Sequence, residues 1–182
     1  MKKALVIYQS ITGNTEKVAK SICQGLHDGG VQVVCRTINE GVEENFYDYD
    51  LVCFGAPSYN WHVTKPAEEY LKSKFQQYKK ENRILPGAPE IPGKHALVFC
   101  TYSGPHTGIR EAVPTGLYIG QFFEHFGFHV EDKWYVLSEF VGSEEFNTLG
   151  RMGNIKGLPD ERELERRAQC AQNLSKRLFV NE

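Results

Sequence analysis

The chain has 182 residues, of which 41% are hydrophobic and 24% charged, the ordinary composition of one globular domain with a sizeable core. The formal net charge of −2 argues against a protein that binds nucleic acid through a basic surface. No apolar run approaches the roughly 20 residues of a membrane span. We therefore expect a single domain over residues 1–182, with no nucleic-acid partner and no membrane span.

The cysteines indicate a reducing compartment. They are odd in number and form no Cys-x-x-Cys pair, and they stand at positions 23, 35, 53, 100 and 170. The Met1-Lys-Lys start leads directly into an apolar segment without a small-residue cleavage site. Reduced thiols and a cytoplasmic location are the expectation.

The first apolar segment, residues 4–8, is short and uninterrupted, as in a parallel strand buried on both faces. Hydroxyl and amide donors follow it between Ser10 and Thr15, and Gly13 permits a turn with positive φ. A helix predicted to begin near Asn14 would present free backbone amides and the positive end of its dipole. This combination favours a bound anion.

The stretch from Gln9 to Thr15 contains no basic residue. A nucleotide triphosphate loop would carry Gly-Lys-Ser/Thr, and a dinucleotide fingerprint would carry three spaced glycines. Neither is present, so neutral donors indicate a single terminal phosphate. The alternative is an ordinary strand, turn and capped helix.

The predicted first helix extends through Leu26 and ends at the glycines 29–30, and a less regular strand follows at 31–35. Another apolar strand, 51–55, leads into a loop at 56–62 that is rich in flat and hydrogen-bonding side chains. Such a loop suits a planar polar heterocycle. The alternative is a surface loop with one anchored tryptophan.

A helix from Pro66 and a proline-rich loop at 81–93 lead to a fourth strand, 96–100. The loop after it, 101–108, contains two glycines, one proline and several donors, as in a ligand-binding loop. His106 in this loop is either an acid, base or donor, or simply polar lining.

The last third of the chain predicts a helix from Pro114 to about Gly127 and a fifth strand over 129–138. A glycine-rich irregular segment at 142–159 is long enough for a lid or an interface. The closing helix runs from Asp160 to about Phe179.

The alternation of strands and helices predicts an α/β fold: a three-layer sandwich around a five-stranded parallel sheet of order 2-1-3-4-5. In that order the chain reverses direction between the first and third strands, so the loops at 9–15, 56–62 and 101–108 converge on one crevice. Three loops of complementary chemistry at one crevice are more specific than any one of them.

The Ser-x-Thr-Gly-Asn-Thr stretch at 10–15 resembles the phosphate loop of flavodoxins, and the later loops match that family in placement and character. The resemblance implies a flavodoxin-like domain that binds FMN. It also implies that Tyr59 or Trp61 flanks the flavin on one side and Tyr102 on the other. The cofactor-binding residues expected from it are Ser10, Ile11, Thr12, Gly13, Asn14, Thr15, Pro57, Ser58, Tyr59, Asn60, Trp61, Thr101, Tyr102, Ser103, Gly104, His106 and Gly108.

Two features depart from small electron-transfer flavodoxins: the chain is less acidic, and its third loop lacks their Gly-Asp pair. The preferred interpretation is an FMN-dependent redox protein that exchanges electrons with a protein partner. The first alternative is an NAD(P)H-dependent FMN quinone reductase with a small-molecule acceptor. The second is a binding module with this fold and no redox turnover.

Overall fold

The computed structural model describes residues 1–179. Five strands form its parallel sheet: β1 (Lys3–Tyr8), β2 (Gln32–Thr37), β3 (Leu51–Tyr59), β5 (His95–Tyr102) and β6 (His129–Leu137). The helices are α1 (Asn14–Asp28), α2 (Lys65–Lys80), α3 (Val113–His125), α4 (Glu144–Thr148) and α5 (Glu161–Phe179), with 3₁₀ turns η1 (Phe46–Asp48) and η2 (Gly108–Glu111). Within this described part, no helix is long and apolar enough to cross a membrane.

The sheet has the order β2-β1-β3-β5-β6, with all of these neighbours parallel. In terms of its five parallel strands this is the predicted order 2-1-3-4-5, which is confirmed. One further strand, β4 (His62–Val63), pairs antiparallel with the end of β3. Sequence reasoning placed a loop there.

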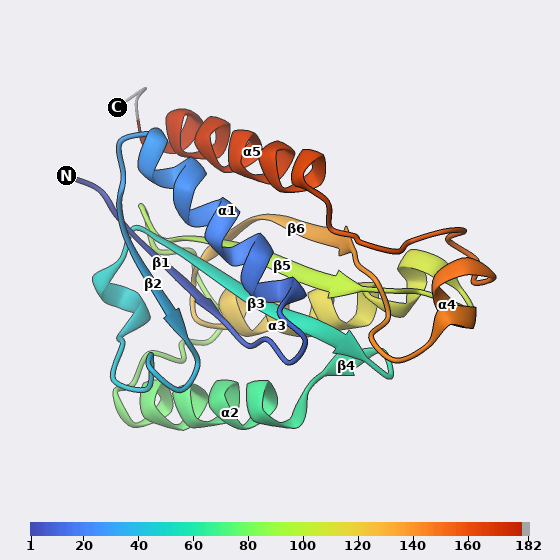
Figure 1. Ribbon diagram of the computed structural model, residues 1–182. Coiled ribbons are helices and arrows are strands. Elements are labelled where there is room, and N and C mark those ends of the chain that lie inside the picture. Colours follow the sequence, from blue (N-terminus) through green and yellow to red (C-terminus); the bar gives the residue numbers. More distant parts are fainter. Residues whose placement is uncertain (180–182) are drawn as a thin grey trace.

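Helices cover both faces of the sheet (Figure 1). Successive residues of β1 alternate between the two cores: Leu5 and Ile7 pack with residues of α2 and α3, whereas Ala4 and Val6 pack with α1 and α5. Residues 4–7 are completely buried, so the apolar run follows from contact with helices on both sides. The three predicted layers are present.

The helices α1 and α5 lie side by side on one face (Figure 1). Their contact depends on Gly25, because a Cβ at this position would lie 1.9 Å from the carbonyl oxygen of Ala168. Glycine therefore permits a close approach of two backbones here. This packing fixes α1, whose first residues reach the carboxyl end of the sheet.

Candidate functional site

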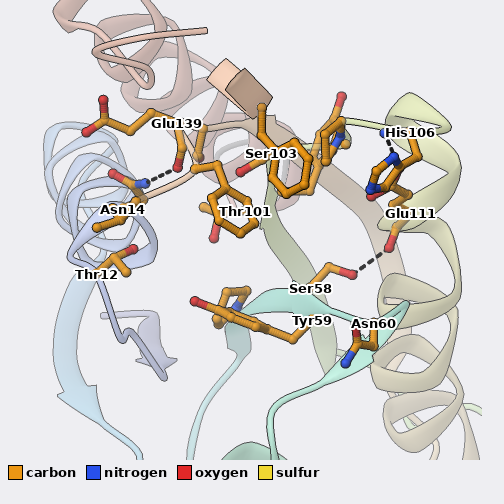
Figure 2. Close-up of a pocket in the computed structure, with 18 of the residues that line it drawn as sticks. Thr12, Asn14, Ser58, Tyr59, Asn60, Thr101, Ser103, His106, Glu111 and Glu139 are labelled. Carbon is orange, nitrogen blue, oxygen red and sulfur yellow. Dashed lines mark hydrogen bonds between the residues drawn. The ribbon is translucent and has the colours of Figure 1, made fainter. Parts of the chain in front are cut away.

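A cavity of about 450 Å³ opens at the carboxyl ends of β1, β3 and β5 (Figure 2). The three predicted loops meet there, together with a fourth segment that follows β6. The lining consists of Thr12, Asn14, residues 57–61, residues 101–107, Glu111, residues 138–141 and Phe146. The cavity therefore lies where the topology of an open α/β sheet places ligand sites.

One end of the cavity is formed by the amino terminus of α1. Gly13 precedes the helix with φ of +91° and has no side chain with which to cap it, and of the first three helical amides that of Glu16 donates to Ser10 Oγ. The amides of Asn14 and Thr15, as the first helical residues, have no acceptor within the helix. Free amides and the helix dipole make this end suitable for an anion such as a phosphate monoester.

Two buried side chains fix the first loop to its neighbours. The Thr15 hydroxyl lies 2.8 Å from the Thr101 hydroxyl of β5, and both residues are buried. The Asn14 side-chain amide donates to the Glu139 carbonyl oxygen, which follows β6, at 3.3 Å (Figure 2). These contacts fix the position of this helix end relative to β5 and to the segment after β6.

Not every predicted residue of the first loop lines the cavity. Ser10 Oγ accepts from the Glu16 amide at 3.3 Å, and the Ile11 side chain is 58% exposed. Thr15 is engaged with Thr101, and Gly13 acts through its backbone. The predicted residues outside the lining are Ser10, Ile11, Gly13, Thr15 and Gly108.

The second predicted loop is a β-hairpin between β3 and β4. Tyr59 pairs with His62 across the turn, while Asn60 and Trp61 have φ of 48° and 64°. Two consecutive residues with positive φ match a type I′ hairpin turn. The hairpin is backed by α3, where Tyr118 packs on the His62 ring at 4.6 Å between ring centroids. Tyr59 and Trp61 are 44% and 61% exposed and lie at the cavity.

The third loop is held in place by a carboxylate that sequence reasoning missed. Glu111 Oε1 accepts from the amides of His106 at 2.9 Å and Thr107 at 2.5 Å. The Glu111 carbonyl oxygen accepts from the Ser58 hydroxyl at 2.6 Å, which connects this loop to β3 (Figure 2). Because Glu111 occupies the two amides, they are not available to a ligand in this conformation.

The lining on the far side comes from the segment after β6. Asn147 of α4 binds both backbone groups of Phe140, at 2.7 and 2.9 Å. This arrangement brings the Phe140 and Phe146 rings together at 5.1 Å, and Phe146 lies 5.3 Å from His106. The predicted irregular segment 142–159 thus contains a helix, and its length was the signal that it has a role at the site.

Tyr102 lies at the cavity but is largely buried. Burial raises the pKa of its hydroxyl, and the charges of Arg167 and Glu163 on α5 influence that pKa in opposite directions. The aromatic rings of Phe140 and Phe146 provide further flat surfaces at the cavity.

The geometry fits an elongated ligand with a phosphate at one end and a flat ring system at the other. Thr12 and Asn14 stand at one end of the view in Figure 2, and His106 and Glu111 stand at the other. Tyr59 from the hairpin and Ser103 from the third loop lie on opposite sides between these ends. FMN has this combination of a single phosphate and a planar heterocycle.

Comparisons with known proteins agree with the fold. Residues 5–85 match the family model of the flavodoxin domain. A curated NAD(P)H dehydrogenase (quinone) of Archaeoglobus fulgidus is 24% identical over 133 residues, which cover 59% of this chain and 65% of that protein. The match thus spans just under two thirds of that relative.

Solved structures extend the likeness to nearly the whole chain. Oxidised flavodoxin 2 of Bacillus cereus has a TM-score of 0.66 at 18% identity, covering 97% of this chain and 99% of that one. A flavodiiron core from Synechocystis has the same TM-score at 18% identity, covering all of this chain and 37% of that one. The resemblance to flavodoxins is confirmed, and the findings support a flavodoxin-like family.

Proposed function

Taking the flavodoxin-like fold as the premise, we propose that the chain binds FMN in this cavity and exchanges electrons with a protein partner through the bound flavin. The amino terminus of α1, whose first two amides have no acceptor within the helix, lies at one end of a cavity with aromatic walls, and this is the observation that carries the proposal. Its donors are neutral, and a helix amino terminus stabilises a phosphate dianion without a basic side chain.

The residues of the chain bind and orient the cofactor. The amides at 14–15 and the Thr12 hydroxyl would hold the phosphate, and the hairpin residues Tyr59 and Trp61 would form a wall for the ring system. When bound, the flavin supplies the redox chemistry, and stacking and hydrogen bonding tune it. Glu111 positions the third loop at the other end of the cavity.

We expect FMN to bind much more tightly than riboflavin. A charge-assisted hydrogen bond is worth roughly 1.5–3 kcal/mol, so two such bonds to the phosphate correspond to at least about 100-fold in affinity. Calorimetric titration of flavin-free protein with both flavins measures the ratio. The Thr12→Ala variant should weaken FMN binding and leave riboflavin binding unchanged.

Two outcomes of this titration contradict different parts of the proposal. Equal affinities for FMN and riboflavin would contradict the proposed phosphate site at α1. If the protein bound neither flavin, the proposed cofactor itself would be wrong.

The second candidate function is an NAD(P)H-dependent FMN quinone reductase. The observation that favours it is the relationship to a protein named NAD(P)H dehydrogenase (quinone). The two functions differ in whether a nicotinamide nucleotide reduces the bound flavin directly, which a rate measurement can decide.

A further inference from the structure

Two cysteines face each other between α1 and the edge strand β2. Cys35 of β2 pairs in register with Val6 of β1, and both side chains belong to the core on the α1 face of the sheet. Cys23 follows the buried Ile22 on α1 and packs against the same core. The Cys23 thiol donates a hydrogen bond to the Cys35 sulfur. The fold therefore brings together two sulfurs from different elements.

Positive charge lies close to the Cys35 sulfur. Lys20 lies on α1, three residues before Cys23, and Arg36 follows Cys35 on β2. The hydrogen bond from Cys23 and these two cations lower the pKa of the Cys35 thiol, while burial and Glu40 act in the opposite direction. Because the thiolate is the nucleophilic form of cysteine, Cys35 is the reactive member of the pair. Both cysteines are partly exposed, so a small molecule can reach them.

The other three cysteines lack this combination. Cys53 pairs with Val6 from the other side of β1, so it lies two strand spacings from Cys35. That is about 10 Å, whereas a disulfide needs Cα atoms within roughly 7 Å of each other. Cys53 and Cys100 are fully buried, and burial raises the pKa of both thiols. Cys170 lies on α5 and is partly exposed, like the pair, which makes it a useful control.

The position of the pair allows a bond to close. The two sulfurs must approach to about 2 Å to form a disulfide. Among the described strands, β2 is paired with β1 alone, because it lies at the edge of the sheet. A small shift of β2 toward α1 therefore breaks no second strand pairing. Cys23 and Cys35 lie outside the lining of the cavity described above.

We propose that Cys23 and Cys35 form an oxidation-sensitive dithiol, in which a hydroperoxide converts the pair to a disulfide between α1 and β2. The Cys35 thiolate attacks one peroxide oxygen, the O–O bond breaks, and Cys35 becomes a sulfenic acid. The Cys23 sulfur then attacks the Cys35 sulfur, the S–O bond breaks, and the Cys23 proton leaves with the hydroxide as water. Two thiols are oxidised, and hydrogen peroxide is reduced to two molecules of water.

Mass spectrometry of the peroxide-treated protein tests the proposal. The folded chain is exposed to hydrogen peroxide, and the remaining thiols are then blocked with N-ethylmaleimide in denaturant. Trypsin cleaves after Lys20 and Arg36, so the peptide 21–36 contains both cysteines of the pair and no other cysteine. We expect this peptide to be unblocked and about 2 Da lighter than its reduced form, because a disulfide lacks two hydrogen atoms. Dithiothreitol before blocking should restore both thiols.

Serine variants separate the roles of the two cysteines. In Cys23→Ser the sulfenic acid has no second thiol to attack it, so we expect dimedone to label Cys35. Cys35→Ser should slow the oxidation of Cys23 at least about tenfold, because the reactive thiolate is missing. Cys170→Ser is the matched control, since it removes a partly exposed cysteine of α5, and it should leave the bond within 21–36 unchanged.

Two results would overturn the proposal. One is that both cysteines of 21–36 are blocked by N-ethylmaleimide after an exposure that oxidises most of the glutathione in a parallel sample. The other is a disulfide that joins Cys23 or Cys35 to any other cysteine, in the same chain or in a second copy. Both results come from the unsubstituted chain, so they do not depend on how the variants fold. The outcome is expected with and without FMN, which keeps it separate from the proposed function.

Discussion

At the residue scale, Glu111 shows what one carboxylate contributes to the site. Its side chain holds two consecutive amides of the third loop, and its backbone accepts from Ser58 of β3. The loop is therefore fixed by hydrogen bonds to a charged group, which are worth roughly 1.5–3 kcal/mol. The position of His106 at the cavity depends on this contact.

We expect Glu111→Ala to weaken FMN binding about tenfold or more, because two amides lose their acceptor and the loop is free to move. Glu111→Gln keeps an oxygen acceptor and should retain most of the affinity. Thr107→Val is a control, because it removes only a hydroxyl contact of 3.3 Å. Flavin titration measures each affinity. Equal losses of FMN affinity in Glu111→Gln and Glu111→Ala would show that the affinity depends on the charge of Glu111 and not on its contact with the loop amides.

The sequence predicted most of the residues at the cavity but not those on its far side. Thr12 and Asn14 follow β1, and the residues at 57–61 lie at the carboxyl end of β3, where position in an α/β fold indicates a role. Glu111 acts on amides four and five residues earlier, and no spacing rule marks such a contact. Phe140 and Phe146 reach the cavity through hydrogen bonds of Asn147, which local sequence does not reveal.

At the element scale, the hairpin is the main difference from expectation. Strand β3 continues to Pro57, two residues beyond its last pair with β1 at Gly55. At Pro57 the strand is still paired with β5 but no longer with β1. A proline is tolerated at such a position because a missing amide need not leave an acceptor unpaired. The turn residues Asn60 and Trp61 also lack the glycine that usually marks this hairpin.

Trp61 has a conformation that a non-glycine residue adopts at a cost of roughly 1–2 kcal/mol. The structure thus places a strained aromatic residue at the cavity, a pattern common at functional sites. We expect flavin-free Trp61→Gly to have a free energy of unfolding about 1 kcal/mol higher than that of Trp61→Ala. Both should bind FMN more weakly than the unmodified chain, to a similar extent, because both lack the ring.

Urea denaturation of the two Trp61 variants measures this difference. Both variants lack the indole ring, so the difference between their free energies of unfolding reports the backbone conformation at residue 61. Equal stabilities would show that the turn is not strained at this residue. Unchanged FMN affinity in both would assign the flanking role to Tyr59 or to a ring on the other side.

At the scale of the whole molecule, the fold was predictable because the strand, helix and turn patterns of the sequence are all consistent with it. Buried apolar runs, helix patterns between them and turn residues at their ends all indicate the same sheet order. The proposed function is less accessible to sequence than the fold, because it depends on what can approach the cavity. The cavity is lined by segments distant in sequence, and only their three-dimensional arrangement places them together.

Access to the cavity also bears on direct reduction by a nicotinamide nucleotide. Hydride transfer requires the nicotinamide to stack on the flavin, with the reacting atoms about 3–3.5 Å apart. Aromatic side chains from three segments line the cavity: Tyr59 and Trp61 from the hairpin, Tyr102 from β5, and Phe140 and Phe146 from the segment after β6. The segment 142–159 contains two cations of the type that binds dinucleotide phosphates: Lys156 forms an ion pair with Glu144, and Arg151 lies against η2.

We therefore expect reduction of the FMN-loaded protein by NADH or NADPH to be slower than about 1 s⁻¹, the low end of typical enzyme turnover. Dithionite should reduce the same sample completely, which controls for loss of flavin. Anaerobic stopped-flow mixing with each nucleotide measures the rate, and Arg151→Ala and Lys156→Ala should not change it. Fast reduction that either substitution abolishes would favour the quinone reductase. In that case the two cations would bind the nucleotide phosphates, and the cavity walls would have to move apart to admit the nicotinamide.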